Sequence, residues 1–197
     1  MKKISKPELC DGKKKVLRKQ MNSLLHSLPA DVCAAGSSVI CRSLWQSEKY
    51  KTAKRIMAFL HMAGEVSLDA FIDRAVKDGK EIYVPRCLDE GRMEGVRLYS
   101  LDAAVSGRYG IRTAAGGAPV CDRRQLDWLI VSGLAFDRQG HRLGRGAGFY
   151  DRFAENLRGD IVWAVAHGFQ LIDSVPVEEH DVSVSAIVTE KEYISTI

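Results

Sequence analysis

Asp127–Phe136 reads DWLIVSGLAF, and Gly140–Arg152, a few residues later, reads GHRLGRGAGFYDR. The first segment is apolar without alternation, which is typical of a strand buried on both faces in the middle of a parallel sheet. The second segment carries four glycines and three arginines and leads into helical spacing over residues 149–157. A strand, a glycine-rich connection and a helix in this order are typical of open α/β sheets, in which ligands bind beyond the carboxyl ends of the strands.

The glycine-rich connection predicts a site for a phosphate-rich ligand. Glycine lets the backbone approach an anion closely, a following helix points free N–H groups at it, and arginine adds forked donors that match phosphate. The segment is neither a Walker A sequence nor a dinucleotide fingerprint, because no Gly-Lys-Ser/Thr closes it and Gly144, Gly146 and Gly148 alternate. A structural turn would explain the glycines but not Arg142 and Arg145 within the turn.

Asp151 stands in the first turn of the helix that should follow. A carboxylate there could complement the helix dipole. It could equally bind Mg²⁺, which favours one or two carboxylates together with phosphate oxygens. The sequence leaves both readings open.

Strands and helices alternate along the rest of the chain. We expect helices over residues 13–28, 31–45 and 67–78, with Asp31 and Ser67 as caps, and strands over residues 55–60, 81–85, 161–167 and 186–189. An antiparallel pair is expected within 90–101 and a loop over 107–121. This alternation predicts an α/β fold: an open, mostly parallel sheet with helices on both faces, in a single domain. Residues 1–12 are expected to be a flexible extension and residues 13–197 the domain.

Composition narrows the class of protein. The 197 residues are 46% hydrophobic and 27% charged, with a net charge of +4. Such a balance suits an anionic small molecule better than a nucleic acid. The five cysteines are odd in number and show no Cys-x-x-Cys, which argues against disulfides or zinc and favours a reducing cytoplasm. No apolar run reaches the ~20 residues of a membrane helix, and the N-terminus does not read as a secretory signal.

Two smaller clusters add to the candidate site. Lys14 and Arg18 are four residues apart and share a helix face, as a solvated basic surface or as a second phosphate clamp. Glu65 follows the first expected strand, where it could hold a polar heterocycle or act as a helix-entry acid. No two histidines have metal-site spacing. Tyr109, Phe149 and Tyr150 could stack on a flat ligand, whereas Trp163 is expected in the core.

Asp127–Asp137 together with Gly140–Asp151 closely resembles the 5-formyltetrahydrofolate cyclo-ligase, or methenyltetrahydrofolate synthetase, family. Other pieces follow in the family's order, so that the resemblance runs from about Lys13 to Glu190: Lys14 and Arg18, Glu65-Val66, Gly79-Lys80, Val84-Pro85 and Pro176-x-Glu178-x-His180-Asp181.

The resemblance implies an α/β enzyme that uses ATP and Mg²⁺ to close the formyl group of 5-formyltetrahydrofolate into 5,10-methenyltetrahydrofolate. It implies a small-molecule reduced folate as substrate, and we expect a monomer. By position Lys14 and Arg18 match ATP contacts, and Asp151 matches a magnesium ligand. In catalysis we expect Arg145 to stabilise charge, because phosphoryl transfer chiefly needs positioning and charge stabilisation. The ATP loop corresponds to Arg142, Leu143, Gly144, Arg145, Gly146, Ala147, Gly148, Phe149 and Tyr150; the folate contacts correspond to Leu60, Glu65 and Arg145 through Phe149.

Three departures from the family pattern bear on this reading. Ser185 stands where the family often has a second acidic residue, so a second protein ligand for Mg²⁺ is in question. Thr113-Ala114 follows Gly110-Ile111-Arg112 where many members have Glu-Pro. Phe149 replaces a frequent tyrosine and removes a hydroxyl.

Two other functions fit parts of the sequence. Another phosphate-handling α/β enzyme, such as a sugar-phosphate isomerase or a transferase, would share the architecture. A non-enzymatic nucleic-acid binder using the basic N-terminal helix would need a broad basic stripe with exposed aromatic side chains. The joint presence of Lys14, Arg18, Glu65 and the glycine-rich segment favours the folate enzyme.

Overall fold

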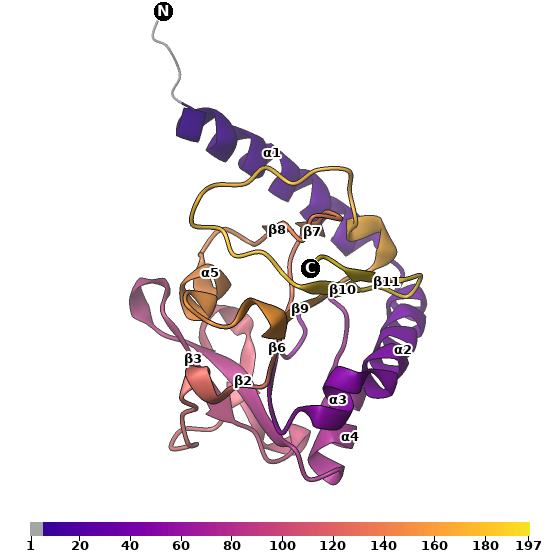
Figure 1. Ribbon diagram of the computed structural model, residues 1–197, viewed down its shortest axis with the longest axis vertical. Helices are drawn as coiled ribbons and strands as arrows, with labels where there is room; N and C mark the ends of the chain where they lie inside the picture. The colour runs from indigo at the N-terminus through magenta and orange to yellow at the C-terminus, as the bar shows by residue number, and fades with distance from the viewer. Residues whose placement is uncertain (1–5) are drawn as a thin grey trace, which may run out of the picture.

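A seven-stranded sheet forms the centre of the computed structural model, which describes residues 6–197 (Figure 1). Its strand order is β11-β10-β9-β6-β1-β2-β3. The five inner strands run parallel, and the edge strands β3 and β11 are antiparallel to their neighbours. The strands of the sheet are β1 (Arg55–Ala58), β2 (Glu81–Cys87), β3 (Met93–Arg97), β6 (Trp128–Val131), β9 (Val162–Val165), β10 (Ala186–Val188) and β11 (Tyr193–Ser195).

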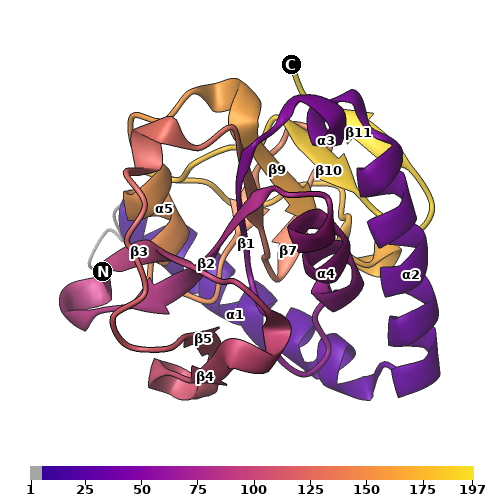
Figure 2. The same ribbon diagram turned by 90° about the horizontal axis from the view of Figure 1, so that it is seen from below.

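The helices lie on both faces of this sheet (Figure 2). They are α1 (Lys6–Ser27), α2 (Ala30–Gln46), α3 (Glu48–Thr52), α4 (Asp69–Lys77) and α5 (Phe149–Ala154). Alternate residues of a strand point to opposite faces. Ile56 and Trp128 therefore pack with α2 and α4 in one core cluster, while Met57 and Leu129 pack with α5 in another. The predicted architecture is confirmed.

A third apolar cluster lies apart from the two faces of the sheet. Met21 and Leu25 of α1 pack on Leu134 and Leu143, which belong to a small hairpin segment. This hairpin pairs β7 (Ala135–Phe136) with β8 (Arg142–Leu143). The contact places the basic N-terminal helix beside the glycine-rich segment (Figure 1).

The order of the parallel strands creates a crevice between β1 and β6. From β1 the chain moves outward to β2 on one side, and then to β6, β9 and β10 on the other. The loops that follow β1 and β6 therefore diverge at the carboxyl ends of these strands. Such a switch point is where open α/β sheets bind ligands.

The N-terminal helix begins earlier than the sequence predicted. It starts at Lys6 rather than at residue 13, so residues 6–12 of the expected extension are helical, and residues 1–5 lie outside the described part. The cap of α2 is Pro29 rather than Asp31, which lies in the first turn. The cap of α4 is Leu68 rather than Ser67. The start of α1 was therefore wrong by seven residues, and the two caps were wrong by two and one, because caps depend on backbone angles that tertiary contacts adjust.

The expected strand over residues 127–136 is divided. The sheet strand β6 ends at Val131, and the chain bends before β7 pairs with β8. Gly133 permits the bend, because a Cβ there would lie 2.6 Å from the ring of Phe136. The free loop is consequently shorter than predicted and runs only from Gly144 to Gly148.

Pairing elsewhere also differs from expectation. No antiparallel pair forms within residues 90–101; β3 pairs with β2 instead. The expected loop over 107–121 contains β5 (Arg112–Ala114), which pairs with β4 (Ala104–Ser106). The edge strand β11 was not predicted. Long-range pairing decides short strands of this kind, and their local sequence carries little signal.

Candidate functional site

A buried carboxylate shapes the hairpin that precedes the loop. Asp137 is fully buried and accepts hydrogen bonds from the N–H groups of Gln139 and His141, each at 3.1 Å, and from that of Val175 at 2.9 Å. The His141 ring lies 2.9 Å from the same carboxylate. Gly140 turns the chain at a φ of +86°. Gly140 and His141 therefore belong to the hairpin turn rather than to a ligand loop.

The loop 144–148 is anchored where it enters α5. Gly148 caps the helix in the left-handed region, at a φ of +66°. The Arg152 guanidinium donates hydrogen bonds to the carbonyls of Ala147 and Gly91. The helix α5 has only six residues, so the attraction for an anion comes chiefly from basic side chains.

An apolar cavity opens at the switch point between β1 and β6. Leu60 and Glu65 line it from the loop after β1, and Phe149 and Tyr150 line it from α5. The cavity suits a flat, partly polar ligand. Its other lining residues are Phe59, Met62, Pro85, Cys87, Met93, Ile111, Ser132, Gly133, Arg142, Gly144, Arg145, Ala147, Gly148 and Asp151.

A polar cavity lies on the other side of the loop. Lys14 and Arg18 reach it from α1, so both side chains line the same cavity. Among the described residues its lining includes the bases Lys14, Arg18, Arg142 and Arg152, and the acids Asp11, Asp151, Glu155, Glu178, Glu179 and Asp181. Since the acids outnumber the bases, a polyphosphate accompanied by a cation fits this wall better than a bare polyphosphate.

The loop forms a wall common to the two cavities. Arg142, Gly144, Ala147, Gly148 and Asp151 line both of them. A ligand in the apolar cavity and a ligand in the polar cavity would therefore meet at the same short stretch of backbone. This geometry allows transfer of a group between two bound molecules.

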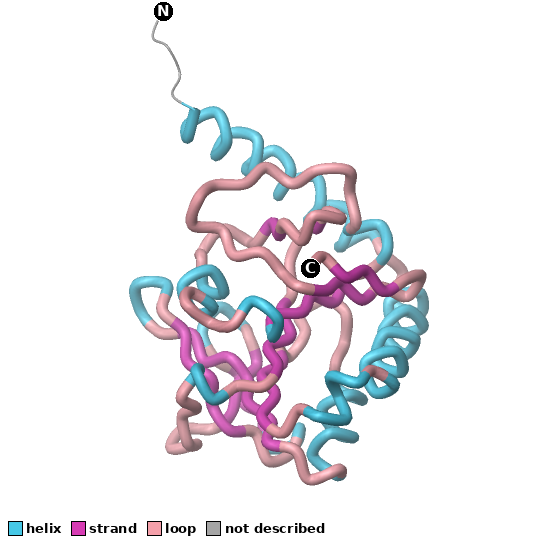
Figure 3. The backbone as a smooth tube through the Cα atoms, in the orientation of Figure 1, coloured by secondary structure: helices cyan, strands magenta, loops and turns pink. Residues whose placement is uncertain are grey.

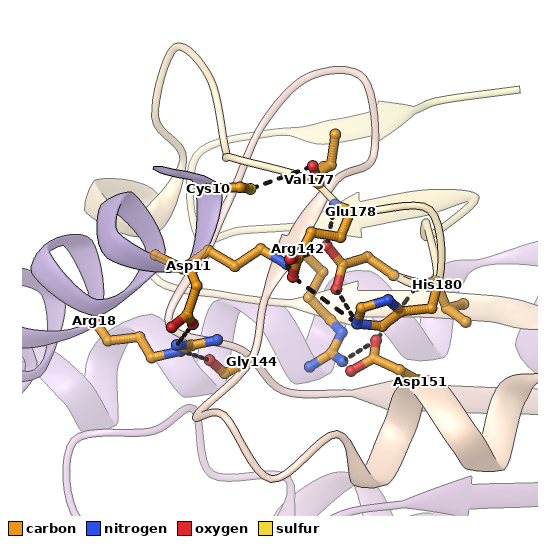
Figure 4. Close-up of polar contacts among 12 residues, drawn as sticks. Cys10, Asp11, Arg18, Arg142, Gly144, Asp151, Val177, Glu178 and His180 are labelled. Carbon is orange, nitrogen blue, oxygen red and sulfur yellow. Dashed lines mark hydrogen bonds and ion pairs between the residues drawn. The ribbon is translucent and has the colours of Figure 1, made fainter. Parts of the chain in front are cut away.

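Arg142 and Asp151 form a buried ion pair at this wall. Their N···O distance is 2.8 Å, and their side chains are 5% and 18% exposed. Arg142 also donates to the Ser132 carbonyl at 3.3 Å and lies over the Tyr150 ring, 5.4 Å from its centroid. The Oδ1 atom of Asp151 accepts a hydrogen bond from Arg142 (Figure 4). The same atom accepts the Val182 N–H at 3.3 Å. The Oδ2 atom of Asp151 has no hydrogen-bond partner among residues 10–197, the part of the chain whose side chains are described.

Arg145 is held at the mouth of the apolar cavity. Its guanidinium donates to Oε1 of Glu65 at 2.9 and 3.2 Å and to the side-chain oxygen of Asn22 at 3.0 Å. The other oxygen of Glu65 accepts the Met62 N–H at 3.0 Å. Glu65 faces the cavity rather than the start of α4, so its geometry fits the binding reading better than the helix-entry reading.

Lys14 and Arg18 contact different partners. The Lys14 ammonium donates to Glu178 at 2.6 Å and to Asp181 at 2.5 Å. Burial lowers the pKa of Lys14, but the hydrogen bonds and charges of Asp181 and Glu178 outweigh this and raise it above its ordinary value. Arg18 donates to the Gly144 carbonyl at 3.1 Å (Figure 4). Lys14 and Arg18 therefore contact residues 178–181 and the loop respectively, whereas Lys13, Lys15 and Lys19 are exposed to solvent.

The three departures from the family pattern have different outcomes. Ser185 is buried, and its hydroxyl donates to the Val162 carbonyl at 3.0 Å, so it does not line either cavity. Ile111 lines the apolar cavity, and Arg112 beside it bonds Asp69 at 3.0 Å. Phe149 keeps an aromatic ring at the cavity.

Sequence reasoning missed part of the site. Asn22, Glu178 and Asp181 contact the predicted residues Arg145 and Lys14 but received no role. The segment Pro176-x-Glu178-x-His180-Asp181 was noticed only as a family match, and its approach to α1 is a tertiary contact. Trp163 packs on Trp128 and Tyr193 away from both cavities, as expected for a core residue.

Comparison with known proteins decides the family. Residues 11–190 match the model of the 5-formyltetrahydrofolate cyclo-ligase family. The chain belongs to this family. This match confirms the resemblance and the prediction of an enzyme. It favours the cyclo-ligase family over a sugar-phosphate isomerase or transferase.

Relatives in the cyclo-ligase family cover most of the chain. The 5-formyltetrahydrofolate cyclo-ligase of Mus musculus is 29% identical over 189 residues, which covers 90% of this chain and 93% of the mouse protein. That of Escherichia coli K12 is 33% identical over 147 residues, covering 70% and 78%.

Solved structures agree with this family assignment. The structure of Aquifex aeolicus 5,10-methenyltetrahydrofolate synthetase matches with a TM-score of 0.83 at 27% identity, covering 93% of this chain and 92% of that one. A synthetase from Mycoplasma pneumoniae, with a TM-score of 0.73 at 19% identity, supports the fold.

One negative result concerns membranes. Within residues 6–197 no single helix is long and apolar enough to cross a bilayer. Cys10–Ser27 and Ala30–Gln46 reach the required length and composition only together, across a bend of 101°.

Proposed function

We propose that this protein converts 5-formyltetrahydrofolate to 5,10-methenyltetrahydrofolate in a reaction that consumes ATP, requires Mg²⁺ and releases ADP and phosphate. The wall shared by the two cavities carries the proposal. The apolar cavity suits the flat rings of a reduced folate, and the polar cavity suits a nucleotide polyphosphate. Phosphoryl donor and acceptor would meet at the loop 144–148.

Each predicted site residue has a place in this scheme. Lys14 and Arg18 would contact the phosphates of ATP from α1, together with the loop from Arg142 to Tyr150. Leu60 and Glu65 would contact the folate, with the Glu65 carboxylate accepting N–H groups of the heterocycle. Phe149 would border its rings, and the loop from Arg145 would lie against both ligands.

The chemistry needs an activated formyl group. Its oxygen attacks the γ-phosphorus of ATP, a new O–P bond forms, and the bond to ADP breaks. The N10 nitrogen of the folate then attacks the formyl carbon, its proton is released, and phosphate departs with the former formyl oxygen. Phosphoryl transfer depends chiefly on positioning and charge stabilisation. No protein nucleophile is required, and Arg145 supplies positive charge at the boundary.

The donor set of Asp151 fits Mg²⁺. Arg142 and Val182 hold Oδ1, which leaves Oδ2 available. Mg²⁺ typically takes one or two carboxylates and completes its shell with phosphate oxygens and water. When bound, it would neutralise charge on the phosphates. Ser185 contributes no second carboxylate, because its hydroxyl is committed to the Val162 carbonyl.

A spectroscopic assay tests the proposal. Purified protein with 5-formyltetrahydrofolate, ATP and Mg²⁺ should produce the absorbance of 5,10-methenyltetrahydrofolate. Omitting ATP, or chelating Mg²⁺, should abolish the signal. The absence of product from folded protein in the complete mixture would refute the assignment and return attention to other phosphate-handling reactions.

A further inference from the structure

Lys14 is an unusual member of the basic N-terminal run. Its neighbours Lys13 and Lys15 are exposed, whereas Lys14 is only 3% exposed. Taking an ammonium out of water costs several kcal/mol unless it is paired with good geometry. Glu178 and Asp181 provide that pairing at 2.6 and 2.5 Å. Two carboxylates therefore hold this one lysine.

Both carboxylates come from a segment without regular structure. Residues 173–183, here called the strap, contain no helix or strand and pass beside α1 (Figure 3). Cys10 of α1 donates to the Val177 carbonyl of the strap at 3.4 Å. On the other side, the Val182 N–H donates to Asp151 of α5 at 3.3 Å. The strap therefore spans the polar cavity between the two helices that carry the predicted phosphate and metal contacts.

Asp181 is the more firmly fixed of the two carboxylates. Its Oδ2 atom accepts both the Lys14 ammonium and the Glu178 N–H, the latter at 2.7 Å. Its own N–H donates to the Glu178 carbonyl at 3.1 Å. These contacts close a tight turn, so Asp181 is held by backbone hydrogen bonds of the turn as well as by Lys14. Glu178 holds Lys14 by a longer side chain that is less constrained.

The hydrogen bonds of Lys14 leave room for one further acceptor. An ammonium has three N–H donors, and Glu178 and Asp181 accept two of them. Among residues 10–197, whose side chains the structure describes, the third has no acceptor, and Lys14 lines the polar cavity. The arrangement keeps the lysine charged and extended, with one donor left for a ligand.

We infer that Asp181, supported by Glu178, is a positioning residue that holds Lys14 so that its remaining N–H meets a phosphate oxygen of the nucleotide. This inference rests on the proposed function, in which Lys14 contacts ATP. Asp181 makes no contact with the nucleotide and acts only through Lys14. The opposite arrangement, in which the carboxylates compete with phosphate for Lys14, would reverse the sign of every effect below.

A double-mutant cycle on ATP binding tests the inference. The Kd of Mg·ATP is measured by calorimetry without folate for the full-length wild type, Lys14→Met, Asp181→Asn and the double variant. A hydrogen bond to a charged group is worth about 1.5–3 kcal/mol, so Lys14→Met should weaken binding about 10- to 100-fold. Asp181→Asn, which leaves the lysine in place, should weaken it roughly 5- to 20-fold. In the Lys14→Met background Asp181→Asn should change the Kd less than about twofold.

Kinetics and controls separate positioning from a loss of folding. Asp181→Asn should raise the KM for ATP while kcat stays within about threefold. Glu178→Gln provides a milder second variant with an effect of the same sign. Asp173→Asn, an exposed change in the same strap, should leave both constants unchanged.

These measurements test the ATP contact of Lys14 separately from the positioning role of Asp181. Wild-type affinity in Lys14→Met would remove Lys14 from the proposed ATP site. Weak binding by Lys14→Met, combined with unchanged or tighter binding by Asp181→Asn, would overturn the role of Asp181 alone. An equal effect of Asp181→Asn in both lysine backgrounds would show that it acts through the strap rather than through Lys14.

Discussion

Replacing Asp151 with alanine should destabilise the protein by about 3 kcal/mol. The change leaves the Arg142 guanidinium buried without a charged partner. Its remaining contacts are the Ser132 carbonyl at 3.3 Å and the face of the Tyr150 ring. Breaking a buried ion pair by removing one partner typically costs about 3–5 kcal/mol. Water reaches Asp151, the more exposed partner of the pair, so the lower end of that range applies.

Thermal and urea unfolding measure this cost. In a domain of this size 1 kcal/mol corresponds to roughly 2–4 °C, so the Tm should fall by about 6–12 °C. Asp151→Asn should cost less, about 1–2 kcal/mol, because its side-chain oxygen still accepts Arg142 and the Val182 N–H. The same variant should raise the Mg²⁺ concentration needed for half-maximal turnover, since it removes the charge from the proposed ligand.

An exposed ion pair of similar length is the matched control. Arg138 and Glu192 are 2.7 Å apart but 59% and 38% exposed. Glu192→Ala should therefore cost less than about 1 kcal/mol. Converting both buried partners to apolar residues, as in Arg142→Met with Asp151→Leu, should restore much of the stability lost in Asp151→Ala. Equal effects of Asp151→Ala and Glu192→Ala on the urea midpoint would refute the reasoning.

Five further substitutions, one of them a control, probe the loop, the cavity mouth and the core. Arg145→Ala should lower turnover by roughly one to three powers of ten as a transition-state charge is lost; near wild-type kcat would contradict its role. Gly146→Ala should lower the free energy of unfolding by about 1 kcal/mol, because Gly146 has a φ of +108°, and it should raise the KM for ATP. Gly117→Ala is the control: Gly117 has a φ of +81° and open space around it, so the variant should lose about as much stability with an unchanged KM. Tyr109 adopts a φ of +58° and its ring lies 6.0 Å from that of Phe149, so Tyr109→Gly should relieve strain yet raise the KM for folate; an unchanged KM would remove the ring from the site. Burial lowers the pKa of His167 despite the nearby charge of Glu190, so the unfolded chain binds a proton more readily and the free energy of unfolding should fall as pH drops below 6.5. His167→Asn should reduce this dependence of the unfolding free energy on pH, measured by urea titration at several pH values, and an identical dependence would exclude His167 as its source.

Much of the fold could be predicted from local patterns. The unbroken apolar segment at Trp128–Val131 identified the central strand, because a strand covered on both faces has no polar side. The amphipathic spacing of α4 identified a helix packed on one face. The same patterns did not predict β11 or the pairing of β3 with β2, because both depend on strands that neighbour them only in the folded sheet.

The loop shows where local reading stops. The four glycines between residues 140 and 148 looked like one connection from strand to helix. Tertiary structure assigns Gly140 to a hairpin turn organised by the buried Asp137, and leaves Gly144–Gly148 as the loop. The hairpin forms because α1 covers it with Met21 and Leu25, a contact that bridges more than a hundred residues of sequence.

The sequence by itself determined the class of sheet and the family, and it predicts a phosphate-rich ligand, since residue type and spacing encode periodicity, charge and backbone freedom. Only the tertiary structure decided that one loop separates an apolar cavity from a polar one. It also decided that Asp151 forms an ion pair with Arg142, and that Lys14 forms one with Asp181. Buried charged groups need partners of opposite charge, and the energy of each pair depends on a distance and an exposure that no local pattern contains.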